Sequence, residues 1–427
     1  MQDVMAEFYD GPHATPAPAL EGPIYLGIKN MTEDGHLDLS DIRHIAESDY
    51  STWTRRVEPR PGDLIFTYEA SLHRYAVIPQ GFRGTLGRRV ALLRPRADVV
   101  DTRFLLYTFI SPQWRATVQK RINVGSTVDR LPLTDFPKFP LRIPPLSIQR
   151  RVAAVLSAYD DLIENSNRRI KVLEEMGRCL YHEWFVSFHY PGHEQVPLVR
   201  SELGPIPETW RVTTISDVAR STRYAVTSGP FGSKLGANDY VPEGVPVIRG
   251  TNLAVGGGFR DADFVFITND KADEMRSCLA HAGDIVVTQR GTLGQVGLIP
   301  YPARFERYVL SQSQMKITVD SDQGSSQYLY AALRSDEVTQ RLQRHAMTAG
   351  VPHINLSILR NFKVVWPAVA LQVEASRTLE VLGDQVLGLT RMGECARAAR
   401  DLLLPRLISG EIDVTQLDIA VPEGEAA

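Results

Sequence analysis

Residues 62–79 read GDLIFTYEASLHRYAVIP, and residues 283–300 read GDIVVTQRGTLGQVGLIP. The two stretches align over eighteen positions without a gap, and six of these positions are identical. A match of this length at one offset is typical of an internal repeat. We therefore predict that one domain occurs twice in this chain and does one job at two places.

The match continues on both sides of these stretches at nearly the same offset. Asn30 corresponds to Asn252, and the residues PPLSIQ at 144–149 correspond to PAVALQ at 367–372. The offset drifts by only a few residues, which places the insertions in loops.

Each copy is followed by a long segment with the periodicity of an amphipathic helix. Apolar or small residues recur every three or four positions over residues 148–185 and again over residues 371–407. At 1.5 Å per residue, a helix of about 38 residues is roughly 57 Å long. A long helix with a narrow apolar seam needs a partner helix to cover the seam, and the nearest candidate is the equivalent helix of the other copy. We expect an antiparallel coiled coil.

The segments that precede these helices have the mixed pattern of α/β heads. Strands are predicted at 24–28, 63–67, 76–78 and 90–93, and at the equivalent residues 247–249, 284–288, 297–299 and 314–318. One helix per head is predicted, at 102–111 and at 327–335, each extended by the amphipathic stretch that follows it. The expected fold is α/β, with two repeated α+β heads, two long antiparallel coiled-coil helices and a pseudo-two-fold repeat.

The same pattern gives the expected domain boundaries. They are a first head at 1–143, a central helix at 144–190, a linker at 191–204, a second head at 205–366, a C-terminal helix at 367–412 and an acidic tail, expected to be disordered, at 413–427.

Charge is distributed unevenly along a chain whose net charge is −3. Residues 23–143 carry 18 Lys and Arg against 13 Asp and Glu, and residues 205–366 carry 17 against 15. The heads are therefore basic relative to the segments that connect them, as phosphate binding requires. A solvated basic face is the alternative explanation.

Cysteine usage and hydropathy indicate the compartment. The three cysteines, Cys179, Cys278 and Cys395, are far apart and do not correspond between the copies, which argues against disulfides and structural zinc. No apolar run is long enough to cross a bilayer, and acidic residues near the N-terminus do not fit a signal peptide. We expect a soluble cytoplasmic protein with no membrane partner.

Binding specificity is expected in loops where the two copies align without gaps but carry chemically different residues. The first such pair is residues 68–74 against 289–295, and the second is residues 125–130 against 350–355. Within the first pair, Arg290 aligns with Glu69. Arg suits guanine, whereas Glu can accept a hydrogen bond from cytosine, so this pair predicts two heads that read different bases. The candidate DNA contacts are Tyr68, Glu69, His73, Arg74, Arg88, Arg89, Ser126, Thr127, Arg130, Lys234, Arg249, Asn252, Gln289, Arg290, Thr292, Gln295, His353 and Asn355.

Several short stretches carry a resemblance to a known family. YHEWFV at 181–186 followed by FHYPGHE at 188–194, SELGPIPETW at 201–210 and ISGEID at 408–413 resemble segments of the specificity subunits of type I restriction-modification systems. The resemblance covers essentially the whole chain. It departs at the start, because nothing before Gly11 matches the region that opens the second copy. Either the first head lacks an edge strand or its first residues are missing.

The resemblance implies how such a protein works. Each head would read one half of a split double-stranded DNA target, and the helices would set the gap and dock two methyltransferase subunits. S-adenosylmethionine would bind on those subunits, and ATP and Mg²⁺ on restriction subunits if these are present.

The chain itself shows no catalytic or cofactor motif. GPFGSK at 229–234 has its lysine in the wrong place for a P-loop, and the ten histidines show no metal-ligand spacing. We therefore expect a non-catalytic chain without a cofactor or metal of its own. Two other classes stay open: a coiled-coil scaffold whose heads bind proteins, and a self-contained DNA-modifying enzyme.

Overall fold

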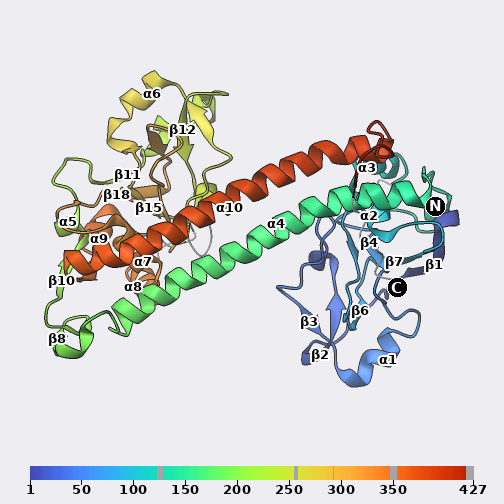
Figure 1. The fold of residues 1–427 in the computed structure, drawn as a ribbon, viewed down its shortest axis with the longest axis horizontal. Helices are drawn as coiled ribbons and strands as arrows, with labels where there is room; N and C mark the ends of the chain where they lie inside the picture. Colours follow the sequence, from blue (N-terminus) through green and yellow to red (C-terminus); the bar gives the residue numbers. More distant parts are fainter. Residues whose placement is uncertain (123–127, 254–257, 292, 347–352, 420–427) are drawn as a thin grey trace. The chain divides into compact units, whose positions relative to one another are not determined.

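The computed structural model describes the chain except for residues 123–127, 254–257, 292, 347–352 and 420–427. It divides into two compact units (Figure 1). The first unit consists of Met1–Asn167 and Thr390–Ala427, and the second of Arg168–Leu389. Both long helices have residues in both units, so each unit contains a part of each helix.

The first unit contains two small sheets. A four-stranded antiparallel sheet has the order β1-β7-β4-β5, and a three-stranded sheet has the order β3-β2-β6, with β2 and β6 parallel. The strands are β1 (Met5–Asp10), β2 (Ala19–Leu26), β3 (Arg43–His44), β4 (Leu64–Thr67), β5 (Tyr75–Val77), β6 (Gly84–Leu86) and β7 (Val90–Pro95).

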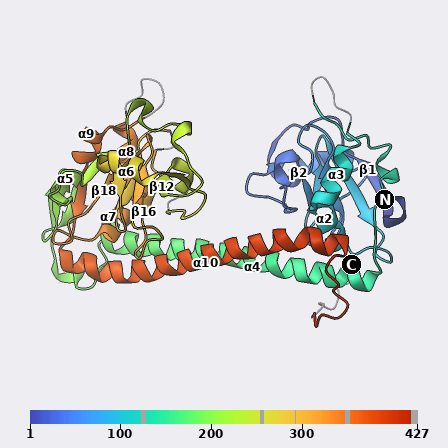
Figure 2. The ribbon, with the colours of Figure 1, turned by 90° about the horizontal axis from the view of Figure 1, so that it is seen from above.

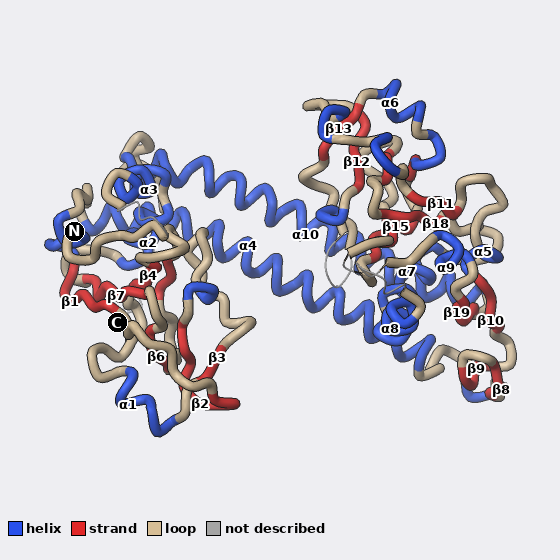
Figure 3. Tube along the Cα trace, turned by 180° about the vertical axis from the view of Figure 1, so that it is seen from behind, coloured by secondary structure: helices blue, strands red, loops and turns tan. Residues whose placement is uncertain are grey.

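The second unit repeats this arrangement. Its sheets have the orders β11-β18-β15-β16 and β13-β12-β17-β14, again with one parallel pair, β12 with β17. Strands β11, β15 and β18 of the first sheet and β12 and β13 of the second are labelled in Figure 3. The strands are β11 (Val226–Ser228), β12 (Val245–Ile248), β13 (Val265–Ile267), β14 (Leu279–Ala280), β15 (Ile285–Thr288), β16 (Val296–Leu298), β17 (Tyr308–Leu310) and β18 (Gln314–Ile317).

Strand register confirms that the repeat is structural. Thr67 lies opposite Val90 in the first unit, and Thr288 lies opposite Gln314 in the second. All eight predicted strands are present within one or two residues of their expected ends, except that β2 begins earlier. Strands β1 and β11 were not predicted, because each is formed by pairing with a distant strand, β7 or β18.

The shared Gly-Asp has a structural explanation in both units. Gly62 and Gly283 have φ values of 86° and 81°, which favour glycine. The buried carboxylate that follows accepts a backbone N–H from three residues earlier and pairs with a cation on the neighbouring strand. In the first unit, Asp63 pairs with Arg94 at 2.8 Å, and in the second, Asp284 pairs with Lys316 at 2.8 Å.

Each head has two helices where one longer helix was predicted. These are α2 (Thr102–Ile110) and α3 (Pro112–Gln119) in the first unit, and α7 (Ser326–Arg334) and α8 (Asp336–Arg344) in the second. The continuous-helix prediction is wrong because Ser111 and Ser335 adopt extended backbone conformations between the helices. The hydroxyl of Ser111 accepts the backbone N–H of Trp114 and caps α3. The hydroxyl of Ser335 accepts the backbone N–H of Val338 and caps α8.

The long helices are α4 (Leu146–Tyr181), which continues into a π-helical turn at His182–Val186, and α10 (Val369–Ser409). Each has, in its first turn, a fully buried glutamine that hydrogen-bonds to its own head. The side-chain oxygen of Gln149 accepts the backbone N–H of Asp101, the N-cap of α2, at 2.9 Å. In the second unit, Gln372 makes the equivalent bond to Ser325, the N-cap of α7, at 3.0 Å.

Within each unit, the parts of α4 and α10 that it contains pair in opposite directions, as predicted (Figure 2). In the first unit, Arg400 of α10 donates to Asp160 of α4 at 2.6 Å, and Asp160 also accepts the hydroxyl of Tyr107 at 2.6 Å. Burial and the charge of Asp160 raise the pKa of Tyr107. In the second unit, a Cβ at Gly177 of α4 would lie 3.6 Å from Leu379 of α10.

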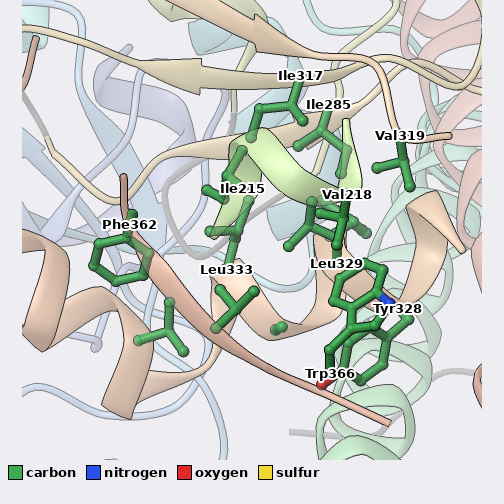
Figure 4. Packing of buried hydrophobic residues seen from close by; sticks show 14 of the residues in the cluster. Ile215, Val218, Ile285, Ile317, Val319, Tyr328, Leu329, Leu333, Phe362 and Trp366 are labelled. Carbon is green, nitrogen blue, oxygen red and sulfur yellow. The ribbon is translucent and has the colours of Figure 1, made fainter. Parts of the chain in front are cut away.

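The main core of the second unit is formed by the β11-β18-β15-β16 sheet, the head helices and parts of the long helices. Figure 4 shows Ile285 and Ile317 of the sheet above Leu329 and Tyr328 of α7, with Trp366 beside them. The equivalent core of the first unit includes Phe66 and residues of both long helices.

The second unit has strand pairs that the described part of the first unit lacks. Strand β10 (Arg211–Thr214) pairs with β19 (Lys363–Trp366), and no described strand pair of the first unit corresponds to it. This pair contains part of the region that opens the second copy, for which no match was found before Gly11. The segment predicted as a linker includes part of a hairpin formed by β8 (Leu198–Ser201) and β9 (Gly204–Pro207). The remaining helices are α1 (Tyr50–Trp53), α5 (Ile215–Val218), α6 (Asn269–Glu274) and α9 (Leu356–Arg360).

Candidate nucleic-acid interface

The two loops predicted to carry specificity lie next to each other in both units. An antiparallel bridge joins Glu69 to Arg130 in the first unit, and an equivalent bridge joins Arg290 to His353 in the second. The loop that follows β4 or β15 is therefore in contact with a segment about sixty residues further along the chain. The sequence alone did not place these loops together.

In the second unit, the first of these loops borders an open groove of about 790 Å³. The groove lies beside the ends of β12, β15 and β18, in the head labelled by these strands in Figure 1. Its described lining residues include three arginines and three glutamines but no Asp or Glu. They are Leu235, Tyr240, Arg249, Gly250, Thr251, Leu253, Arg260, Thr288, Arg290, Gln295, Ser311, Gln312, Ser313 and Gln314.

Neighbouring groups hold several of these polar side chains in place. Arg249 donates through Nη2 to the carbonyl of Asp263 at 3.1 Å, and Arg260 pairs with the carboxylate of the same residue. Gln295 donates to the carbonyl of Leu253 at 3.1 Å. The groove wall is therefore organised within the unit itself.

Three buried polar atoms at or next to the groove have no hydrogen-bond partner among the described residues: Nε of Arg249, Nε2 of Gln314 and Oε1 of Gln289. Native structures leave few buried polar groups unpaired, so each of these atoms calls for an explanation. A bound molecule that offers an acceptor to Arg249 and Gln314 would satisfy two of them.

The first unit shows a different chemistry at the equivalent loop. The carboxylate of Glu69 lies 2.9 Å from Nε of Arg89 and 3.8 Å from Nε of Arg130. Its side chain is only 21% exposed. Glu69 therefore holds two arginines, and this placement favours a positioning role over a direct contact with cytosine.

Four predicted contacts have structural roles. Asn252 is fully buried, accepts the backbone N–H of Arg249 and donates to two carbonyls, as its counterpart Asn30 does. Asn355 caps α9. Tyr68 is 1% exposed, and Arg74 donates to the carbonyl of Met31 at 3.0 Å.

The other predicted residues vary in exposure. Arg88 and Lys234 are exposed, whereas Gln289 is buried. His73 is partly buried, and burial, with a smaller contribution from Arg115, lowers the pKa of its imidazole. Ser126, Thr127 and Thr292 lie outside the described residues.

The sequence analysis missed Gln314, Arg260, Gln312 and the two serines of the groove. For Gln314, a signal was present in the repeat. Its counterpart is Val90, so a polar residue replaces an apolar one at an aligned strand position. No group of three or more possible metal ligands is found among the described residues, and no described helix is long and apolar enough to span a membrane.

Comparison with known proteins identifies the family. The model of the type I restriction modification DNA specificity domain matches residues 58–175 and 207–393, one match in each copy of the repeat. The chain belongs to this family.

Curated relatives agree with the family match. The chain is 23% identical over 345 residues to the type I restriction enzyme MjaVIII specificity subunit of Methanocaldococcus jannaschii, covering 79% of this chain and 76% of that one. It is also 23% identical over 388 residues to the MjaIX specificity subunit of the same organism, covering 88% and 83%.

A solved structure has the same fold. The crystal structure of a type I restriction-modification system S subunit from M. genitalium superposes with a TM-score of 0.59 at 15% identity, covering 95% of this chain and 94% of that one. The expected architecture of two α+β heads and two long helices is therefore confirmed, and the family match supports a role in DNA specificity.

Proposed function

We propose that each head of this specificity subunit binds one half of a bipartite duplex DNA target, and that the second unit does so in its arginine- and glutamine-lined groove. The observation that carries this proposal is the composition of the groove wall. It presents three arginines and three glutamines and no described carboxylate.

This composition fits DNA in two ways. Arginines neutralise phosphates, and Arg and Gln are also the side chains that read guanine and adenine edges through paired hydrogen bonds. The glutamines matter for the choice between functions, because a surface that only attracted acidic proteins would need charge and not amides. A scaffold with protein-binding heads is therefore the weaker alternative.

We also propose that catalysis and its cofactors reside on partner subunits. Two methyltransferase subunits would dock on the helices and carry S-adenosylmethionine, and restriction subunits, where present, would carry ATP and Mg²⁺. The chain alone should then neither bind S-adenosylmethionine nor methylate DNA.

Methylation of a randomised duplex library, read by sequencing, tests these proposals together. The chain with its methyltransferase subunit should modify a split target with a constant gap. Methyl transfer by the chain alone would instead indicate a self-contained enzyme, and a complex that modifies DNA without any sequence preference would refute the assignment of the heads.

Arg290 offers a test at the level of one residue. It is exposed, lines the groove and occupies the position of Glu69 in the first unit. We expect Arg290→Ala to weaken binding by about 1–3 kcal/mol and to relax the preference at one position of the second half-site.

Selection from the same library at two salt concentrations separates base contact from phosphate contact. A phosphate contact would weaken binding to all sequences alike and reduce the salt slope by about one. Arg276 is a matched control, because it is an exposed arginine of the same unit that does not line the groove. Unchanged preference and slope in Arg290→Ala would remove Arg290 from the interface.

A further inference from the structure

Hydrogen bonds and strand register align the two heads more exactly than their sequences do. Val90 and Gln314 are equivalent because each lies opposite the shared threonine of the neighbouring strand. Gly27 and Arg249 are equivalent because each donates its backbone N–H to the buried shared asparagine, at 3.0 Å and 2.9 Å.

The positions that have the same residue in both heads stabilise the fold of each head. Asn30 and Asn252 make the same three hydrogen bonds, and Asp63 and Asp284 both pair with a cation. These contacts are internal to each head, so the shared residues carry no information about a ligand.

At four equivalent positions the two heads carry side chains of different chemistry, and in the second unit all four of these residues line the groove. The exchanges from the first unit to the second are Gly27 to Arg249, Glu69 to Arg290, Arg74 to Gln295 and Val90 to Gln314. Residues far apart in sequence thus change together at one place in space, as expected for a surface that was altered to recognise a different ligand.

Gln314 is the most informative of the four. Its side chain is fully buried, on a strand between two neighbours of its sheet, where the first unit has a fully buried valine. Ser311 donates its hydroxyl to Oε1 of Gln314, which leaves Nε2 without an acceptor among the described residues. A valine would fill this place without an unpaired donor, so packing alone does not explain the glutamine.

Arg249 has the same property on the same groove. Its Nη2 is held by the carbonyl of Asp263, whereas its Nε is buried with no acceptor among the described residues. Two unpaired donors on one wall favour a ligand that offers acceptors there. A purine presents N7, and guanine also O6, on its major-groove edge, and a phosphate offers only its oxygens.

We propose that Gln314 and Arg249 determine base preference in the second half-site by donating hydrogen bonds to acceptors on a purine edge. This inference rests on the proposed function of the groove. It gives a specificity-determining role to Arg249, already a candidate contact, and adds Gln314, which lies on a strand and not in a loop.

The test uses the complete chain assembled with its methyltransferase subunit and selection from a randomised duplex library. Gln314→Val introduces the residue that the first unit already tolerates at this position. We expect it to lower discrimination at one position of the second half-site roughly 10- to 100-fold and to leave the first half-site unchanged. Thermal unfolding of the variant confirms that the fold is retained.

The variant Arg249→Lys tests whether Arg249 contacts a base or a phosphate. Lysine keeps the charge but lacks the planar arrangement of donors, so base discrimination should fall while the salt slope stays the same. Arg276→Lys, the same exchange at an exposed arginine that does not line the groove, is the matched control.

The outcomes separate a failure of the proposed function from a failure of the inference about these two residues. If the wild-type complex selects no bipartite target, the proposed function fails. If the wild type selects one and Gln314→Val, while still folded, selects the same target equally well, only the inference about Gln314 fails. Uniform weakening with unaltered preference in Arg249→Lys would assign that residue to the phosphate backbone and overturn its role as a base reader.

Discussion

Replacing Lys316 with leucine is expected to lower the free energy of unfolding of the second unit by about 3–5 kcal/mol, because it leaves a buried carboxylate without its cation. The side chains of Lys316 and Asp284 are 7% and 3% exposed, and their charged atoms are 2.8 Å apart. Thr318 and one backbone N–H would still donate to the carboxylate, but neither carries a positive charge. Chemical denaturation of the chain measures the change.

The repeat supplies a rescue for this variant. The first unit has Leu92 where the second has Lys316, and its cation, Arg94, lies at the position of Thr318. The double variant Lys316→Leu with Thr318→Arg should therefore regain part of the lost stability. Lys363→Leu is the control, because its pair with Glu202 is about half exposed and should contribute about 1 kcal/mol or less. A loss no larger in Lys316→Leu than in this control would show that the buried pair contributes little.

Lengthening both long helices is expected to change the DNA target itself. Seven residues inserted after Asn165 in α4 and seven after Met392 in α10 add about 10 Å to each helix. The gap between the half-sites should grow by about three base pairs, and methylation of the original target should be lost. The reason is that both helices continue from one unit into the other, so we propose that their length sets the gap.

The two insertion points are chosen from the structure. A Cβ at Gly393 of α10 would lie 3.9 Å from Cβ of Ser166 of α4, so both insertions fall at the same level of the pair. Seven residues also preserve the heptad seam, whereas an insertion in one helix alone would shift the seam and serves as the control. An unchanged gap in the double insertion, measured by methylation sequencing, would refute the role of the helices as a ruler.

The repeat explains how much of the site was predictable. The alignment of residues 62–79 with 283–300 identified the loop that contains Arg290, and this residue does line the groove. Asn252 was also among the candidate contacts, but its side chain is used entirely by backbone groups of its own loop. Residue type suggests what a side chain can bind, and only its neighbours show whether its donors and acceptors are already occupied.

By itself, the sequence determined the features that depend on local spacing. These are the strands around the shared Gly-Asp, the two long helices with their three- and four-residue spacing, and the doubling of the architecture. Only the tertiary structure decided which side chains meet. Gln314 was placed within a predicted strand, but its burial, its bond to Ser311 and its unpaired amide depend on β12, β15 and β18 meeting at one groove. Contacts between strands far apart in the chain follow from packing and register, and no local pattern encodes them.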